Sequence, residues 1–192
     1  MTTPTVRVVT LNAGTLLEHG WEDRRHEIVA WLRRLDADIV CLQEIWERIG
    51  EPDTNTARWL VDQLPEHGWH LHFFGGPFSQ ELWPGADLLF GSASLSRWPI
   101  DESHDLLLPT APDEVDRFPA MVPWELAHAR TAGLEVFSCH LASAPLHGHH
   151  RRAQVLAIEE HVRTVRGDLD GALATRRPRD TVPPILCGDF NA

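Results

Sequence analysis

The order of strand-like and helix-like segments limits the folds available to this chain. Residues 5–13 alternate in polarity as a strand does, and apolar residues recur at helical spacing over residues 21–35. The short apolar run over 38–43 predicts a buried strand. A second helix is predicted over 54–64, capped by Thr54. The chain therefore begins with two strand–helix units.

The middle of the chain is a run of further strands. They are predicted over residues 69–74, 87–95, 104–108, 118–127 and 134–141, with the turn AHARTAG (127–133) forming a hairpin between the last two. A helix over 150–166, an Arg- and Pro-bearing loop over 176–184 and a last strand, PILCGDF, complete the order. A simple doubly wound parallel sheet would not hold so many consecutive strands in its middle. The pattern predicts the α+β class, with two packed sheets flanked by helices in a single domain over residues 1–192.

Charge and hydropathy exclude several classes of protein. The 17 basic and 28 acidic residues give a net charge of −11, which argues against non-specific coating of nucleic acid because phosphate backbones attract clustered cations. A local Arg patch can still hold a single phosphate. No apolar run approaches the roughly 20 residues of a membrane helix, and the first residues lack a secretion signal, so we expect a cytoplasmic location.

Three cysteines lie inside strand-like apolar segments, at Cys41, Cys139 and Cys187. A free cysteine in such a segment is usually a small buried hydrophobe. A metal site is the alternative, but no C-x-x-C pair is present. We therefore expect the cysteines to pack in the core.

Histidines and tryptophans leave two further alternatives. His147, His149 and His150 could bind a transition metal, but their density favours a solvated loop that leads into the last predicted helix. Most tryptophans are predicted to face the core. Trp83 and Trp98 lie near prolines and could instead border a substrate cleft.

Polar side chains end four of the predicted strands. Asn12, Glu44 and His140 each follow an apolar run, and Asp189 with Asn191 follows the last one. Strand ends meet at the edge of a sheet, where sites of α/β proteins are commonly built. Carboxylate and amide oxygens suit magnesium or manganese. A histidine suits hydrogen bonding or proton transfer to a phosphate.

Each of these side chains also has a simpler explanation. Glu44 alone could be a solvated carboxylate, and His140 alone could be structural. Asp189 and Asn191 could form a turn, and Asn12 could cap the glycine turn that follows it. The joint pattern favours a site, because four separate strand ends all supply groups that suit a metal or a phosphate.

Four segments in this order resemble the endonuclease/exonuclease/phosphatase superfamily: LNA (11–13), LQE (42–44), SCHLASAP (138–145) and GDFNA (188–192). That superfamily includes pancreatic-type deoxyribonuclease, apurinic endonucleases, sphingomyelinases and inositol polyphosphate 5-phosphatases. GSASLSRWPI (91–100) is similar to its internal strand-and-turn signature. RFPAMV (117–122) resembles the segment whose arginine, here Arg117, contacts the phosphate and neutralises its charge. The resemblance covers essentially the whole chain.

The resemblance implies a four-layer α/β/β/α sandwich with two packed mixed sheets. It also implies a hydrolase that cleaves phosphate esters, phosphodiesters foremost, by in-line attack of an activated water. The implied cofactor is Mg²⁺, with Mn²⁺ as the alternative. The substrate is a nucleic acid, a phospholipid headgroup or a small phosphodiester, and nothing indicates a protein partner.

Roles carry over to the matching positions. Glu44 resembles the principal metal ligand and Asn12 its neighbour in that site. Asp189 would orient or activate the attacking water beside the metal, and Asn191 would contact the phosphate. His140 would hydrogen-bond the phosphoryl oxygens or assist the leaving group.

The sequence also departs from the family. The family pattern continues past GDFN to further strands and a late Asp-His pair, which these 192 residues do not contain. We therefore expect the chain to represent the first two-thirds to three-quarters of the domain. It has no tyrosine, so the tyrosine-dependent arrangement of apurinic endonucleases is unavailable. A non-catalytic module that binds a phosphorylated ligand is the alternative function.

Overall fold

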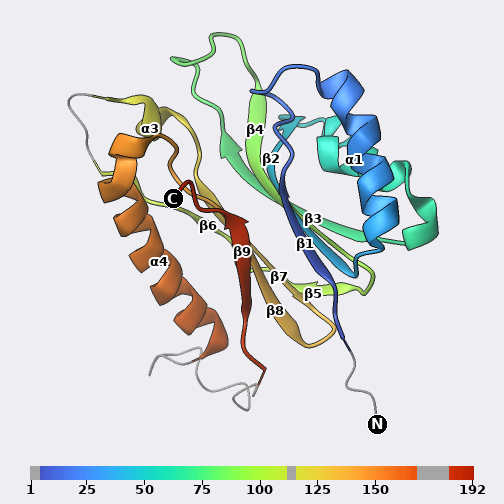
Figure 1. The fold of residues 1–192 in the computed structure, drawn as a ribbon. Coiled ribbons are helices and arrows are strands. Elements are labelled where there is room, and N and C mark those ends of the chain that lie inside the picture. The colour runs from blue at the N-terminus through green and yellow to red at the C-terminus, as the bar shows by residue number, and fades with distance from the viewer. Residues whose placement is uncertain (1–4, 112–115, 168–181) are drawn as a thin grey trace.

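Two β-sheets pack face to face between helices in the computed structural model, which describes residues 5–111, 116–167 and 182–192 (Figure 1). One sheet has the order β1 (Val8–Asn12), β2 (Ile39–Arg48), β4 (Leu88–Ser96), β3 (His70–Pro77). The other has the order β5 (Ile100–Glu102), β7 (Glu125–Thr131), β8 (Leu134–His140), β9 (Ile185–Asp189), and β6 (Leu106–Leu107) also pairs with β7. The β1–β2 and β8–β9 pairs are parallel and the rest antiparallel, so both sheets are mixed, as expected.

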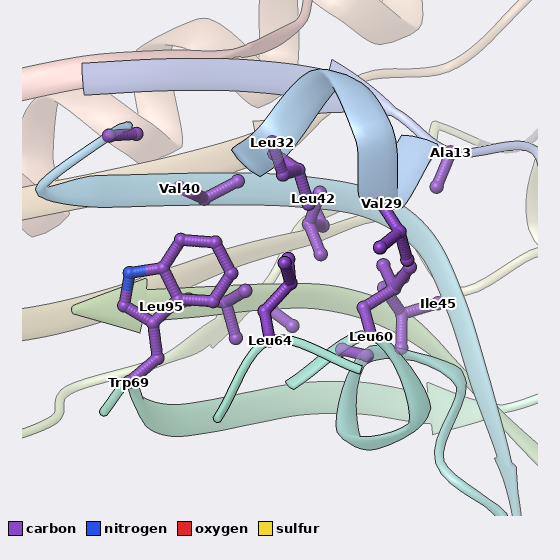
Figure 2. Packing of buried hydrophobic residues seen from close by; sticks show 13 residues of the cluster. Ala13, Val29, Leu32, Val40, Leu42, Ile45, Leu60, Leu64, Trp69 and Leu95 are labelled. Carbon is purple, nitrogen blue, oxygen red and sulfur yellow. The ribbon is translucent and has the colours of Figure 1, made fainter. Parts of the chain in front are cut away.

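Helices cover the outer face of each sheet. Helices α1 (Trp21–Leu35) and α2 (Thr56–Asp62) pack on the β1–β2–β4–β3 sheet, and Figure 2 shows Leu32 of α1 and Leu60 of α2 in one cluster with Leu42 and Ile45 of β2. Helix α4 (Gly148–Arg166) packs on the other sheet through Ile158. A smaller cluster that includes Trp98 lies between the sheets, so Trp98 packs rather than borders a cleft. In the described part of the chain, no helix combines the length and apolarity needed to cross a membrane.

Polar side chains also join the two sheets through the layer between them. Among the described residues, three buried side-chain hydrogen bonds cross this layer: Gln43 Nε2 to Ser138 Oγ (2.8 Å), Ser92 Oγ to Glu125 Oε1 (2.8 Å), and Ser96 Oγ with Thr131 Oγ1 (2.7 Å). Most buried polar groups in proteins are paired in this way, because an unpaired one costs free energy. These bonds therefore fix how the sheets lie relative to each other, and with them the strand ends that carry the site.

The predicted cap of the second helix is wrong by one residue. Asn55, not Thr54, caps α2, and its Oδ1 accepts hydrogen bonds from the Ala57 and Arg58 amides at 2.9 and 3.1 Å. Thr54 ends the short 3₁₀ helix Pro52–Thr54 and accepts from the Arg48 amide instead. Asparagine is a stronger N-cap than threonine.

The predicted strand over 118–127 is only partly correct. Its first half is a short helix, α3 (Phe118–Met121), because Pro119 suits the first turn of a helix, where no amide donor is needed. Within the predicted turn AHARTAG, residues up to Thr131 continue β7, and the turn is Ala132–Gly133. Both have positive φ, 50° and 77°, as tight hairpins require. The strand predicted over 104–108 is only the two-residue β6.

The solvated-loop interpretation is wrong for two of the three histidines near residue 148. His147 and His150 are buried, and only His149 is exposed. His147 Nε2 lies 2.9 Å from Asp116 Oδ2, and His150 Nδ1 accepts from the Ala111 amide at 3.0 Å. No group of three His, Cys, Asp or Glu side chains among the described residues is arranged to hold a metal ion. Most of the predicted 176–184 loop lies outside the described residues.

The cysteines are free thiols, as expected. Cys41 and Cys139 are fully buried, and Cys187 is half-buried. Burial raises the pKa of the Cys139 thiol to about 12, so this thiol is protonated at neutral pH. Core packing is thus confirmed for Cys41 and Cys139.

Candidate active site

Three strand ends and one position inside β2 meet at one end of the sandwich, although the sequence pattern predicted that Glu44 would follow its strand. Asn12 ends β1 and lies in register with Gln43 of the neighbouring β2, just before Glu44. On the facing sheet, His140 and Asp189 end β8 and β9 and are also in register. Parallel pairing aligns the residues within each pair, and contacts between the sheets join the pairs: Asn12 Nδ2 to Asp189 Oδ2 at 2.9 Å and His140 Nε2 to Glu44 Oε1 at 4.0 Å. The structure therefore brings together Asn12, Glu44, His140 and Asp189.

Asn12 lies between the two carboxylates of this cluster. Its Nδ2 donates to Glu44 Oε1 and to Asp189 Oδ2, both at 2.9 Å. Its Oδ1 accepts from the Gly14 amide at 3.0 Å, so Asn12 also caps the glycine turn. In this geometry Asn12 is a hydrogen-bond donor to both carboxylates. Its role as a metal ligand stays a prediction.

Glu44 occupies a bulge in β2. The pairing of β2 with β4 shifts between Leu42 and Ile45, and Glu44 has a φ of 58°. Bulges commonly redirect a side chain beside an active site. Its Oε2 is buried and has no hydrogen-bond partner among the described residues. Burial raises the pKa of Glu44, and the nearby Glu18 and Asp189 carboxylates add to the shift.

His140 lies directly beside this carboxylate. Its Nε2 is 4.0 Å from Glu44 Oε1, and the ring is buried. Burial lowers the pKa of His140 to about 4, against the opposing effect of Asp189. The ring is therefore neutral at neutral pH and offers one N–H donor and one acceptor.

Asp189 and Asn191 form the turn that ends β9. The Asn191 amide donates to Asp189 Oδ1 at 3.0 Å, and Asn191 Nδ2 donates to the Leu141 carbonyl at 2.8 Å. The preceding Gly188 has a φ of 141°, and a Cβ there would lie 2.0 Å from the Cys139 carbonyl oxygen. Only glycine allows this close approach. A phosphate contact by Asn191 stays a prediction.

Arg117 is not part of the cluster in this structure. It precedes α3, is mostly exposed, and pairs with Glu81 through Nη2–Oε2 at 3.0 Å. Among the described residues, no hydrogen bond or ion pair joins its guanidinium to the four clustered side chains. Its contact with a phosphate therefore remains a prediction from the resemblance.

Glu125 is a buried carboxyl that the sequence analysis missed. It is fully buried and lies opposite His140 in the β7–β8 pairing. Its Oε1 accepts from Ser92, while Oε2 has no hydrogen-bond partner among the described residues. Burial raises its pKa well above the usual range. A charged residue after the apolar segment MVPW (121–124) was the available signal, but only the register places it beside His140.

The carboxylates of the cluster fit a hard divalent cation. Glu44 and Asp189 supply oxygens on either side of one amide, and Glu44 Oε2 is left without a hydrogen-bond donor. Magnesium and manganese prefer such oxygen ligands, and a cation would stabilise the charged form of a buried carboxylate. These residues therefore fit the expected cation.

Solved structures share the fold of this chain at low sequence identity. The catalytic domain of human Nocturnin with a bound sulfate anion matches at 21% identity with a TM-score of 0.66, covering 97% of this chain and 64% of that one. A humanized D. rerio TDP2 matches at 16% identity with a TM-score of 0.60, covering 97% of this chain and 66% of that one. An endonuclease/exonuclease/phosphatase from Beutenbergia cavernae DSM 12333 matches at 20% identity with a TM-score of 0.65, covering 97% of this chain and 47% of that one. The chain thus spans less than two-thirds of the length of each.

Sequence comparison assigns the family. A comparison with curated proteins finds no match. The model of the Endonuclease/Exonuclease/phosphatase family matches residues 9–192, which is nearly the whole chain and includes all four residues of the cluster. The chain therefore belongs to the Endonuclease/Exonuclease/phosphatase family.

Proposed function

We propose that this chain carries the site of a divalent-metal-dependent hydrolase that cleaves phosphate esters, phosphodiesters foremost. One observation carries the proposal: Glu44 and Asp189, from opposite sheets, both accept from the same Asn12 amide. Family membership supports it. So do two solved relatives, one with a bound sulfate anion and one, a D. rerio TDP2, with a single-strand DNA product.

Glu44 would be the principal ligand of the cation, and Asp189 would be a secondary one beside it. When bound, Mg²⁺ or Mn²⁺ would stabilise the negative charge that develops on the phosphoryl oxygens. Asp189 would also orient the attacking water, because its carboxylate accepts hydrogen bonds at the end of β9 and is half-buried. The water would attack phosphorus in line with the leaving oxygen.

The remaining side chains would bind the phosphate. The neutral His140 would donate its N–H to a phosphoryl oxygen. Asn191 has a second amide hydrogen besides the one bound to Leu141. Arg117 would exchange its exposed partner Glu81 for the phosphate, at little cost because exposed ion pairs are weak.

Hydrolysis of bis-p-nitrophenyl phosphate by the complete protein tests this proposal. We expect turnover that requires Mg²⁺, stops with chelator, and falls at least about a hundredfold in Glu44→Ala and Asp189→Ala. Glu66→Ala is the matched control, because this exposed carboxylate pairs with Arg33 away from the site. Turnover that resists both chelator and Glu44→Ala would contradict the proposal. Binding of bis-p-nitrophenyl phosphate without its hydrolysis would support the alternative, a non-catalytic module that binds a phosphorylated ligand.

A further inference from the structure

The backbone of Glu44 requires support from its surroundings. Glu44 has a φ of 58°, and a non-glycine residue with positive φ is strained and persists only where its neighbours hold it. The support comes from Thr15, in the loop after β1. The Glu44 carbonyl accepts from the Thr15 amide at 3.4 Å and from the Thr15 hydroxyl. Thr15 thus holds the bulge that directs the Glu44 carboxylate.

Arg24, in the first turns of α1, holds the loop that contains Thr15. Its Nη1 donates to the Ala13 carbonyl at 3.0 Å and its Nη2 to the Gly14 carbonyl at 2.6 Å. Its Nε donates to the His19 carbonyl at 3.0 Å. The planar guanidinium thus spans both ends of the loop, a geometry that a lysine ammonium does not reproduce.

The same loop is tied to the rest of the cluster. The Ala13 amide donates to the Gln43 carbonyl at 3.0 Å, and the Gly14 amide donates to Asn12 Oδ1. Thr15 also accepts at its hydroxyl from Thr56 of α2 at 3.3 Å. A continuous set of hydrogen bonds therefore runs from Arg24 through the loop to both Asn12 and Glu44.

We infer that Thr15 and Arg24 are positioning residues of the site: they hold the loop over residues 13–19 so that Asn12 and Glu44 keep the geometry needed to bind a divalent cation. The inference rests on the proposed metal dependence. Their hydrogen bonds to this part of the site go to the backbone carbonyls of residues 13, 14 and 44, not to the Glu44 carboxylate. They act through the backbone of residues 13–15 and 44.

Titration of the complete protein with Mn²⁺ by calorimetry tests the inference without using activity. Thr15→Val keeps the shape and removes the hydroxyl, whereas Thr15→Ser keeps the hydroxyl. We expect Thr15→Val to bind Mn²⁺ about 10–100-fold more weakly and Thr15→Ser to bind like the wild type, because residues behind metal ligands typically have effects of this size.

Arg24→Lys tests the positioning role of Arg24, with Arg25→Lys as the matched control. Arg25 is the next residue of the same helix, but it pairs with Glu22 and stacks over Trp59 at 4.4 Å from the ring centroid. We expect Arg24→Lys to weaken Mn²⁺ binding about tenfold or more and Arg25→Lys to leave it unchanged. Arg24→Lys should also speed hydrogen exchange of the Thr15 amide while the Leu42 amide keeps its protection.

The outcomes separate the two proposals. If the wild type binds no Mn²⁺, the proposed metal dependence fails, and this inference fails with it. If the wild type binds Mn²⁺ and both Thr15→Val and Arg24→Lys bind it equally well, the inference alone is overturned. Should Thr15→Val not fold, Arg24→Lys decides, since it retains charge and most of the side-chain volume.

Discussion

The side-chain amide of Asn12 lies 2.9 Å from Asp189 Oδ2, although 177 positions separate the two residues. The same amide lies 2.9 Å from Glu44 Oε1. A single neutral donor therefore stands between two carboxylates from opposite sheets. The two N–H groups of the Asn12 amide offset the repulsion between the carboxylates. Loss of this amide should therefore destabilise the protein most when no cation is bound.

Asn12→Asp should make folding depend on the cation. The change removes the donor and adds a third carboxylate, so we expect stability to fall by about 1.5–3 kcal/mol without metal. Saturating Mg²⁺ should restore more stability in this variant than in the wild type. Thermal unfolding with and without Mg²⁺ measures both effects. Asn55→Asp is the control, because Asn55 also donates to a carboxylate, Glu47, at 2.9 Å; equal Mg²⁺ effects in both variants would contradict this prediction.

Glu44→Gln and Asp189→Asn should respond differently to added metal. Glu44→Gln should weaken apparent Mg²⁺ affinity and be partly rescued by more Mg²⁺, because the lost group is chiefly a ligand. Asp189→Asn should lower turnover without rescue, because extra cation does not replace a group that orients water. Rates measured against Mg²⁺ concentration for both variants test these roles. Rescue of Asp189→Asn alone would reverse the assignment.

Glu125→Gln should make the protein more stable at neutral pH. Burial raises the pKa of Glu125 in the folded state, so the native protein binds more protons than the unfolded chain above the ordinary glutamate pKa. Stability from this group is present below that pKa and is lost as pH rises. Glutamine removes this loss and keeps an acceptor for Ser92, so we expect a gain of about 1 kcal/mol or more at pH 7 relative to pH 4. Urea unfolding of the wild type and of Glu125→Gln at pH 4 and pH 7 measures this gain. If the free energy of unfolding changes equally with pH in both proteins, the prediction is refuted.

Gly188→Ala should disturb the β8–β9 pairing. The added methyl would lie 2.0 Å from the Cys139 carbonyl oxygen and 2.7 Å from its amide nitrogen, so a strand must shift. We expect the free energy of unfolding, measured in urea, to fall by more than about 1 kcal/mol. Gly133→Ala separates strain from clash, because Gly133 also has positive φ but a Cβ there meets nothing within 4 Å. Equal losses of unfolding free energy in Gly188→Ala and Gly133→Ala would show that the clash at Gly188 contributes nothing.

Local patterns in the sequence were enough to predict many of the elements and the membership of the cluster. Helical spacing predicted α1 over residues 21–35, and the structure has it at Trp21–Leu35. Asn12, Glu44, His140 and Asp189 were predicted because each follows an apolar run, and the structure brings all four together. Periodicity and strand ends are local properties, so a sequence displays them directly.

The tertiary structure decided how those residues are held and what surrounds them. The positive φ of Glu44, the burial of His147 and the position of Glu125 opposite His140 had no local signal strong enough to predict them. Arg117 paired with Glu81 rather than with the cluster. Each of these depends on strand register or on contacts between distant segments, and a shift of one residue in register would turn a side chain such as Glu125 to the opposite face of its sheet. The sequence by itself determined which chemical groups follow the apolar runs, whereas the structure extended β2 past Glu44 to Arg48. The spacing, orientation and protonation of these groups arose only when the two sheets packed and removed them from water.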